Sequence, residues 1–275
     1  VELSAGQTVS VVMELRTKPA DNLYFTAFRF GVSRVLGQPE IDAAVAAATR
    51  CDKALVFVGR SGEWDTEGSD LENIDLPRNQ NALIDAVCAA NPNTIIILQT
   101  GGPVEMPWVQ RVPAIMQSWY PGQECGNAIA DVVFGDADPG GRLPQTFPTR
   151  WRDNPSHSQD PQIYPGSEGT VRYGEGVNIG YRHYEKHGIV PLFPFGHGLS
   201  YTDFSLTDLT VESDENDVHV TVIVKNIGSR TGSTVVQLYL ADDDPEIERP
   251  IKELRGFAKV TLNASETETL TLTLK

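Results

Sequence analysis

NQNALIDAVCAANPNTIIILQT, residues 79–100, holds the two patterns that decide the fold class. Residues 79–91 place apolar side chains at the spacing of an amphipathic helix. Residues 94–100 form a short apolar run, which is typical of a strand buried on both faces. Two further runs, KALVFVG at 53–59 and PAIMQSWY at 113–120, predict two more strands of the same sheet.

Helical patterns flank these strands. Residues 41–50 are alanine-rich with helical apolar spacing, and residues 126–135 form a third helical pattern that ends at Gly135. Strands that alternate with helices predict an α/β fold with a mainly parallel sheet covered on both faces. Ligands of such sheets bind outside the carboxyl ends of the strands.

The C-terminal part of the chain changes to an all-β pattern. From residue 202 onward, polar and apolar residues alternate in about five runs separated by turn-like segments. This spacing predicts a fibronectin-like or immunoglobulin-like β-sandwich. A complete sandwich has about seven strands, so we expect this one to be truncated.

Two segments do not fit either pattern. Residues 1–32 alternate polar and apolar residues in two runs, which predicts a short N-terminal β segment. Residues 151–201 are rich in Gly, Pro and aromatic residues, and we expect an ordered but irregular connection there. Within the preceding part of the chain, Trp119 and Tyr120 are interpreted as packing residues between a strand and a helix.

Charge and composition narrow the class of partner. The net charge of -15 and the pI near 4.7 argue against nucleic acid and an anionic membrane surface, because no basic patch is available to bind phosphates. No apolar run approaches the ~20 residues that span a bilayer. The three cysteines, Cys51, Cys88 and Cys125, lie far apart without a metal-binding spacing, and we expect buried free thiols and no metal site.

SGEWDTEGSDLENIDLP, residues 61–77, is the stretch with the strongest chemical signal. Six carboxylates lie in it beside a tryptophan, directly after the predicted strand 53–59. A solvated acidic loop is the simplest interpretation of such a charge run. Its position after a buried strand favours a ligand site instead.

Several segments together resemble glycoside hydrolase family 3, the β-glucosidase-like enzymes. They are KALVFVG with TEGSD and IDLP, NQNALIDAVCAANPNTIIILQTGGPVEMPW, WYPGQECGNAIADVVFGDADPGGRLPQTFP and RYGEGVNIGYRHYEKHGIVPLFPFGHGLSYTDF, followed by VVQLYL and RPIKELRGFAKV. The resemblance covers roughly residues 38–275 and implies four parts. They are the end of a PA14-like domain at 1–32, the second part of the α/β sandwich domain at 33–150, the irregular connection at 151–201, and a truncated fibronectin type III-like domain at 202–275.

The resemblance also implies a site. Glu67 matches the glutamate of the family's E-G-x-D motif, which is the general acid/base, and Gly68 permits a tight turn that aims its side chain. Trp64 and Asp70 are expected to bind substrate; the alternatives are that Trp64 packs its own loop and that Asp70 accepts hydrogen bonds of the loop backbone or orients the glutamate. Glu63 is the rival of Glu67 because it also adjoins Trp64. Asp65 is expected to accept backbone hydrogen bonds of the loop or to orient the glutamate.

The resulting functional hypothesis is a part of a retaining β-glucosidase that hydrolyses terminal non-reducing β-D-glucosyl residues without a cofactor. The nucleophile belongs to a catalytic barrel that the sequence does not contain, so the expected partners are that barrel and a β-glucoside or oligosaccharide. We expect the isolated chain to be inactive, and a secreted or extracellular location is favoured. The alternative is a non-catalytic carbohydrate-binding or structural interaction module.

Overall fold

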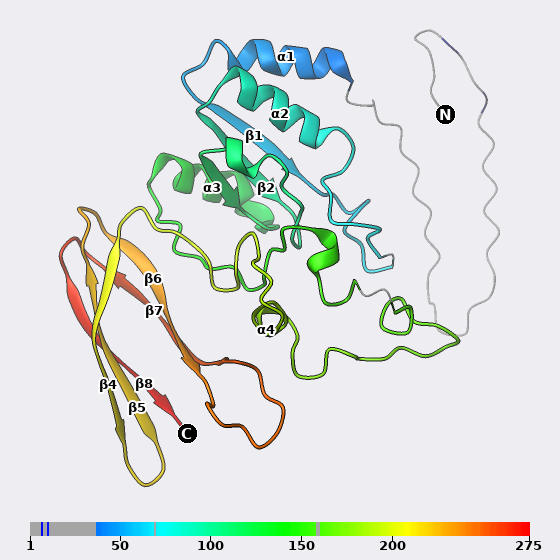
Figure 1. Ribbon diagram of the computed structural model, residues 1–275. Coiled ribbons are helices and arrows are strands. Elements are labelled where there is room, and N and C mark those ends of the chain that lie inside the picture. Colours follow the sequence, from blue (N-terminus) through cyan, green and yellow to red (C-terminus); the bar gives the residue numbers. More distant parts are fainter. Residues whose placement is uncertain (1–6, 8–9, 11–36, 69, 158–159) are drawn as a thin grey trace.

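The computed structural model describes residues 7, 10, 37–68, 70–157 and 160–275 (Figure 1). The predicted β segment at 1–32 falls outside these residues, apart from two isolated positions. The described chain forms an α/β unit followed by a β unit, as the alternating and then all-β patterns predicted.

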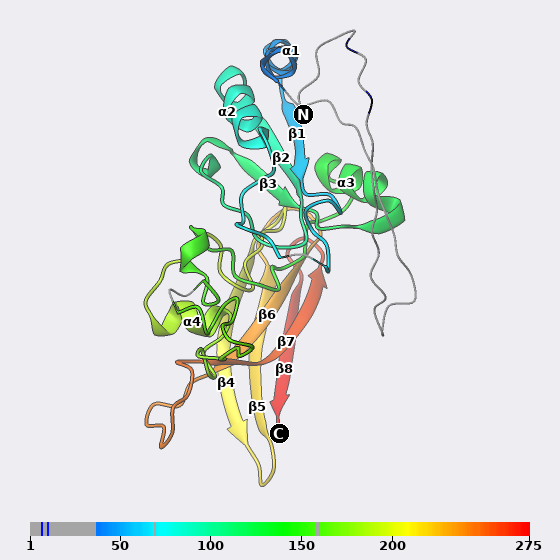
Figure 2. The ribbon, with the colours of Figure 1, turned by 90° about the vertical axis from the view of Figure 1, so that its right-hand side faces the viewer.

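The α/β unit contains a parallel sheet of three strands in the order β1-β2-β3. Its elements are α1 (Gln38–Ala48), β1 (Ala54–Gly59), α2 (Gln80–Ala90), β2 (Thr94–Gln99), β3 (Ala114–Gln117) and α3 (Cys125–Phe134). Helices α1 and α2 lie on one face of the sheet and α3 lies on the other (Figures 1 and 2). Both faces are therefore covered, as expected for a parallel sheet.

The core on the α1 and α2 side explains why this sequence folds in this way. Alternate residues of β2, Ile96 and Leu98, are fully buried there, and Ile84 and Val87 of α2 pack onto them at a spacing of three residues. Ile97 points to the opposite face of the sheet, because successive side chains of a strand alternate, and it is also fully buried.

Strand β3 is shorter than predicted. The apolar run 113–120 indicated a strand to Tyr120, whereas β3 ends at Gln117. Trp119 has a φ of 57°, which is incompatible with extended backbone. At the end of α3, in contrast, Gly135 adopts the left-handed conformation with a φ of 84°, and the predicted helix end is confirmed.

The described residues between the two units, 151–157 and 160–201, are largely irregular, with one 3-10 turn, η3 (Trp151–Asp153), and one short helix, α4 (Tyr181–Lys186). Phe147, just before this segment, pairs with Phe193 near its end through backbone hydrogen bonds. Phe147 is 1% exposed and belongs to the α/β core, and Phe193 packs against that core. The irregular chain is thus held against the α/β unit at its end.

The β unit contains two antiparallel sheets, one of three strands in the order β4-β5-β8 and one that pairs β6 with β7. The strands are β4 (Phe204–Ser213), β5 (Val218–Asn226), β6 (Gly232–Leu240), β7 (Glu253–Leu262) and β8 (Thr267–Leu274). Buried valines of β5 and β6 pack with Val260 and Leu262 of β7 to form the core between the sheets. The predicted sandwich-like arrangement of five strands is confirmed.

Asp138 joins the two units. Its carboxylate accepts hydrogen bonds from the Ser200 hydroxyl (2.7 Å), the Tyr201 backbone N–H (2.9 Å) and the Ser233 backbone N–H of β6 (2.9 Å). Burial by itself raises the pKa of Asp138, but the hydrogen bonds from Tyr201 and Ser233 outweigh it, so the net pKa lies below the ordinary value of 3.8.

Asp138→Ala is expected to lower the free energy of unfolding at pH 7 by about 2 kcal/mol, because charge-assisted hydrogen bonds are lost and the donors of Ser200 and Ser233 stay half-buried. Since the folded pKa is depressed, this stabilisation is complete above pH 3.8 and disappears as the pH falls through the folded pKa. Urea unfolding at several pH values measures both effects. Asp136→Ala, an exposed carboxylate of the same turn, is the control, and an equal loss in both variants would contradict the prediction.

The expectation of buried thiols is wrong for Cys51. Cys51 is exposed because it lies in the turn after α1, Cys125 is half-buried and only Cys88 is buried. All three are free. Among the described residues, no helix is long and apolar enough to cross a membrane. The described part of the chain also contains no group of three or more His, Cys, Asp or Glu residues that could hold a metal ion.

Candidate functional site

The carboxyl ends of the three parallel strands meet at one edge of the sheet. Arg60 follows β1 directly, Gly101 lies just after β2, and Tyr120 lies just after β3. The acidic stretch 61–77 leaves the sheet at this edge, which is the position where ligands of parallel sheets bind.

Asp65 of the acidic stretch contacts all three strand ends. Its carboxylate accepts hydrogen bonds from the Gly101 backbone N–H (3.0 Å) and the Tyr120 hydroxyl (2.5 Å), and the Arg60 guanidinium lies 3.7 Å away. The side chain of Arg60 is 2% exposed and that of Asp65 is 17% exposed. The acidic stretch is therefore anchored at this point rather than solvated throughout.

The surroundings of this cluster shift the pKa values of its two side-chain donors, Arg60 and Tyr120. Burial lowers the pKa of Arg60, and the neighbouring carboxylate of Asp65 opposes that shift. Burial, followed by the hydrogen bond to Asp65, raises the pKa of Tyr120 to about 12. The Tyr120 phenol therefore remains a hydrogen-bond donor across the physiological pH range.

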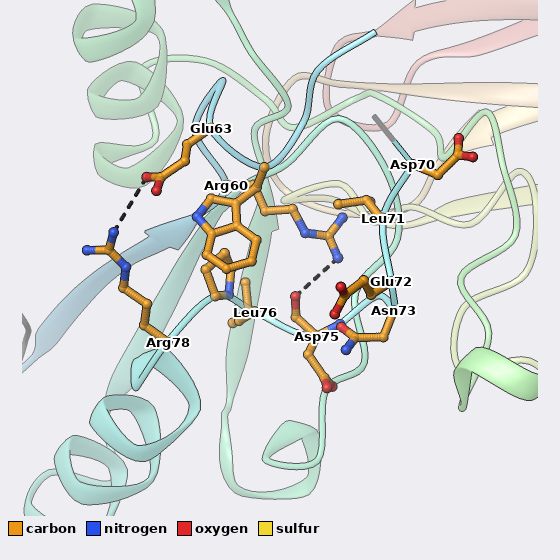
Figure 3. Close-up of a pocket in the computed structure, with 11 residues that line it drawn as sticks. Arg60, Glu63, Asp70, Leu71, Glu72, Asn73, Asp75, Leu76 and Arg78 are labelled. Carbon is orange, nitrogen blue, oxygen red and sulfur yellow. Dashed lines mark hydrogen bonds and ion pairs between the residues drawn. The ribbon is translucent and has the colours of Figure 1, made fainter. Parts of the chain in front are cut away.

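A cavity of about 480 Å³ lies beside this anchor (Figure 3). Its apolar wall is formed by Trp64, Leu71, Leu76 and Pro77, and its carboxylates are Glu63, Asp70, Glu72 and Asp75. Its two arginines are engaged: Arg78 forms an ion pair with Glu63 (3.5 Å), and Arg60 donates to the backbone carbonyl of Asp75 (3.2 Å). A lining that combines apolar side chains with several acceptors suits a neutral ligand with many hydroxyl groups.

The site residues expected from the sequence do not all gather in this cavity. Trp64, which is 39% exposed, and Asp70 both line it. Glu67 is exposed in a turn of the same loop and is not among the described residues that line the cavity. Glu63, its rival, lines the cavity and pairs with Arg78. The assigned roles of Glu67, Trp64 and Asp70 remain predictions.

Three contacts at the site were not anticipated from the sequence. Tyr120 was interpreted as a packing residue, yet its hydroxyl binds Asp65. Its neighbour Trp119 does pack, with its ring edge-to-face against Phe147 at 6.1 Å. The sequence motifs assign no role to Arg60, although its place at the end of a buried strand is a signal of a ligand site.

Tyr164 is the third, and it comes from the irregular connection. A hydrogen bond to Asp70 is the largest cause of its raised pKa. This contact links the connection to the rim of the cavity.

Comparison with known proteins defines the class of protein. The Glycosyl hydrolase family 3 C-terminal domain matches residues 3–201, and a Fibronectin type III-like domain matches residues 234–275. The chain therefore belongs to glycosyl hydrolase family 3 and carries the family's C-terminal domain followed by a fibronectin type III-like domain. The resemblance inferred from the sequence motifs is confirmed.

Individual relatives agree with this assignment. The chain is 50% identical to a β-glucosidase of Rhizobium radiobacter over 99% of its own length and 34% of the relative's. It is 42% identical to the probable β-glucosidase I of Aspergillus clavatus, again over 34% of that protein. The chain thus spans about a third of the length of the curated relatives it matches.

Solved structures agree as well. A crystal structure of the β-glucosidase from Kluyveromyces marxianus in complex with glucose matches with a TM-score of 0.84 and 43% identity, over 88% of this chain and 29% of that one. The family 3 β-glucosidase of Bifidobacterium adolescentis matches with a TM-score of 0.83 and 38% identity, over 87% of this chain and 35% of that one.

Proposed function

We propose that this chain supplies Glu67 as the general acid/base of a retaining β-glucosidase that removes terminal non-reducing β-D-glucosyl residues. The observation that carries the proposal is the position of the acidic loop. The loop leaves the carboxyl edge of the parallel sheet, is anchored there through Asp65, and presents Glu67 to the outside. The names of the relatives described above, which are β-glucosidases or probable β-glucosidases, support the reaction class.

The mechanism has two displacement steps. In the first, a carboxylate outside this chain attacks the anomeric carbon while Glu67 donates its proton to the departing glycosidic oxygen, which leaves as an alcohol. In the second, Glu67 takes a proton from water, and the hydroxide oxygen displaces the nucleophile from the sugar. The two carboxyl groups of such an enzyme lie ~5–5.5 Å apart.

The exposure of Glu67 fits a site that is completed by a second surface. A general acid works in a desolvated position, where a carboxyl group keeps its proton at neutral pH. In this chain Glu67 is exposed, so the nucleophile-bearing surface would both bury Glu67 and close the cavity beside it. Trp64 would then offer its ring to the apolar face of a sugar, and Asp70 would accept a sugar hydroxyl.

A chimaeric enzyme tests this function. The third of the Rhizobium radiobacter β-glucosidase that matches this chain is replaced by residues 1–275, which the 50% identity makes structurally compatible. We expect the chimaera to hydrolyse an aryl β-glucoside and the isolated chain to show no hydrolysis above background. A folded but inactive chimaera would contradict the proposal. Robust turnover by the isolated chain that Glu67→Gln abolishes would also contradict it, because the nucleophile would then lie in this chain.

A further inference from the structure

We propose that Asp65 is a positioning residue that holds the acidic loop, and with it Glu67, in its working place. This inference rests on the proposed function of Glu67. Asp65 precedes Glu67 by two residues, so a fixed Asp65 keeps the Glu67 backbone within about 7 Å of the anchor. Asp65 itself would not touch the sugar.

The anchor is built from contacts to both carboxylate oxygens of Asp65. Its two hydrogen bonds come from different strand ends, the Gly101 N–H at 3.0 Å and the Tyr120 hydroxyl at 2.5 Å. A Cβ at position 101 would lie 3.1 Å from the Asp65 carboxylate and 3.1 Å from the Tyr120 ring. Glycine at this position therefore lets the carboxylate approach the backbone N–H.

Arg60 extends the anchor to the far side of the loop. Its guanidinium lies 3.7 Å from the Asp65 carboxylate and also donates to the carbonyl of Asp75 at 3.2 Å. Both contacts are made by a side chain that is only 2% exposed, so solvent screens them little. Arg60 therefore contacts the loop on both sides of Glu67, at Asp65 and at Asp75.

The other ion pair of the loop is a weaker restraint. The side chains of Glu63 and Arg78 are 65% and 41% exposed, and exposed ion pairs contribute little free energy. Tyr164 holds the loop at Asp70, on the C-terminal side of Glu67. On the N-terminal side, placement of Glu67 therefore depends on the Asp65 cluster. A general acid displaced by about 1 Å can lose ~100-fold in rate, which makes such placement catalytically important.

Two variants of the chimaera test the inference. Asp65→Asn removes the charge that faces Arg60. Tyr120→Phe removes only a hydroxyl and leaves the Arg60 charge compensated, so it tests the same anchor in a protein that folds. The matched controls are Asp85→Asn, which removes an exposed pair with Arg111, and Tyr201→Phe, which removes a phenol hydrogen bond to the Val132 carbonyl.

We expect both test variants to lower kcat about 10- to 100-fold for a glucoside with a poor leaving group, because proton donation then limits the rate. KM for that glucoside should change less than about threefold. For 2,4-dinitrophenyl β-glucoside, whose leaving group needs no proton, kcat/KM reports only the first step and should also change less than about threefold. An equal fall in kcat/KM for both substrates, as general structural damage would cause, would overturn the inference.

Failure of this inference is distinguishable from failure of the proposed function. If Glu67→Gln impairs the chimaera while Asp65→Asn and Tyr120→Phe behave like their controls, only the positioning role is wrong. If Glu67→Gln itself has no effect, the proposed function is wrong. Amide hydrogen exchange in the isolated chain gives a reading that is independent of activity: the Gly101 N–H should exchange at least about tenfold faster in Tyr120→Phe, and an unchanged rate would contradict the anchor.

Discussion

Glu67→Ala in the chimaeric enzyme is expected to lower kcat for a β-glucoside with a poor leaving group by about 10²–10⁴-fold. The loss follows from the two tasks of this side chain, which protonates the departing oxygen and later deprotonates water. Both steps slow when the carboxyl group is removed. Steady-state kinetics with a series of aryl glucosides of graded leaving-group pKa measures the effect.

The dependence of the kcat loss on the leaving group identifies the role of Glu67 better than the size of that loss. With 2,4-dinitrophenyl β-glucoside the first step needs no acid, so glycosyl-enzyme forms but hydrolyses slowly. Added azide should restore turnover, because this anion attacks the anomeric carbon without a general base and displaces the nucleophilic carboxylate. The expected product is β-glucosyl azide, with the retained configuration of a double displacement.

Glu63→Ala is the matched control, since Glu63 lies in the same loop and is the rival candidate. Its carboxylate is engaged with Arg78 at 3.5 Å, and we expect a small effect on kcat and no rescue by azide. If Glu63→Ala gives the leaving-group dependence and azide rescue while Glu67→Ala does not, the general acid is Glu63.

Gly59→Ala is expected to cause the largest loss of stability among these substitutions. A Cβ at this position would lie 2.0 Å from the carbonyl oxygen of Gln99 and 2.8 Å from its carbon. Both atoms belong to the backbone of β2, which pairs with β1 at this point, so the two strands must separate. We expect the free energy of unfolding to fall by about 3 kcal/mol or more, measured by urea denaturation.

The strain of Gly59→Ala would also act on the site, because Arg60 and then the acidic stretch follow Gly59. Gly62→Ala is the control, since a Cβ there meets no heavy atom within 4 Å. It should change the free energy of unfolding by less than about 0.5 kcal/mol. A similar loss of unfolding free energy in the two variants would contradict the prediction, because the close approach of β1 and β2 would then not explain the effect of Gly59→Ala.

Much of the architecture could be predicted from the sequence. The apolar runs at 53–59 and 94–100 correspond to β1 and β2, and the alternating C-terminal runs correspond to the five strands β4–β8. The spacing of apolar residues depends only on residues close together in the chain, so it can be recognised without a structure. The end of β3 was mispredicted because the positive φ of Trp119 leaves no trace in an apolar run.

The location of the candidate site was also predictable, because an acidic stretch directly after a buried strand lies at the carboxyl edge of a parallel sheet. The organisation within that stretch was not. The E-G-x-D motif indicated Glu67, whereas the carboxylate that the three strand ends bind is Asp65. The sequence does not show which of the six carboxylates will be bound in the folded chain, because their partners are distant along the chain.

The sequence by itself determined the family, the order of the elements and the loop that carries the chemistry, since each is encoded in local patterns and motifs. Only the tertiary structure decided that Arg60, Gly101 and Tyr120 meet at Asp65. These residues belong to three strand ends that are distant along the chain, and parallel pairing of β1, β2 and β3 brings them to one edge. The hydrogen bonds that anchor the acidic loop exist only after that pairing has formed.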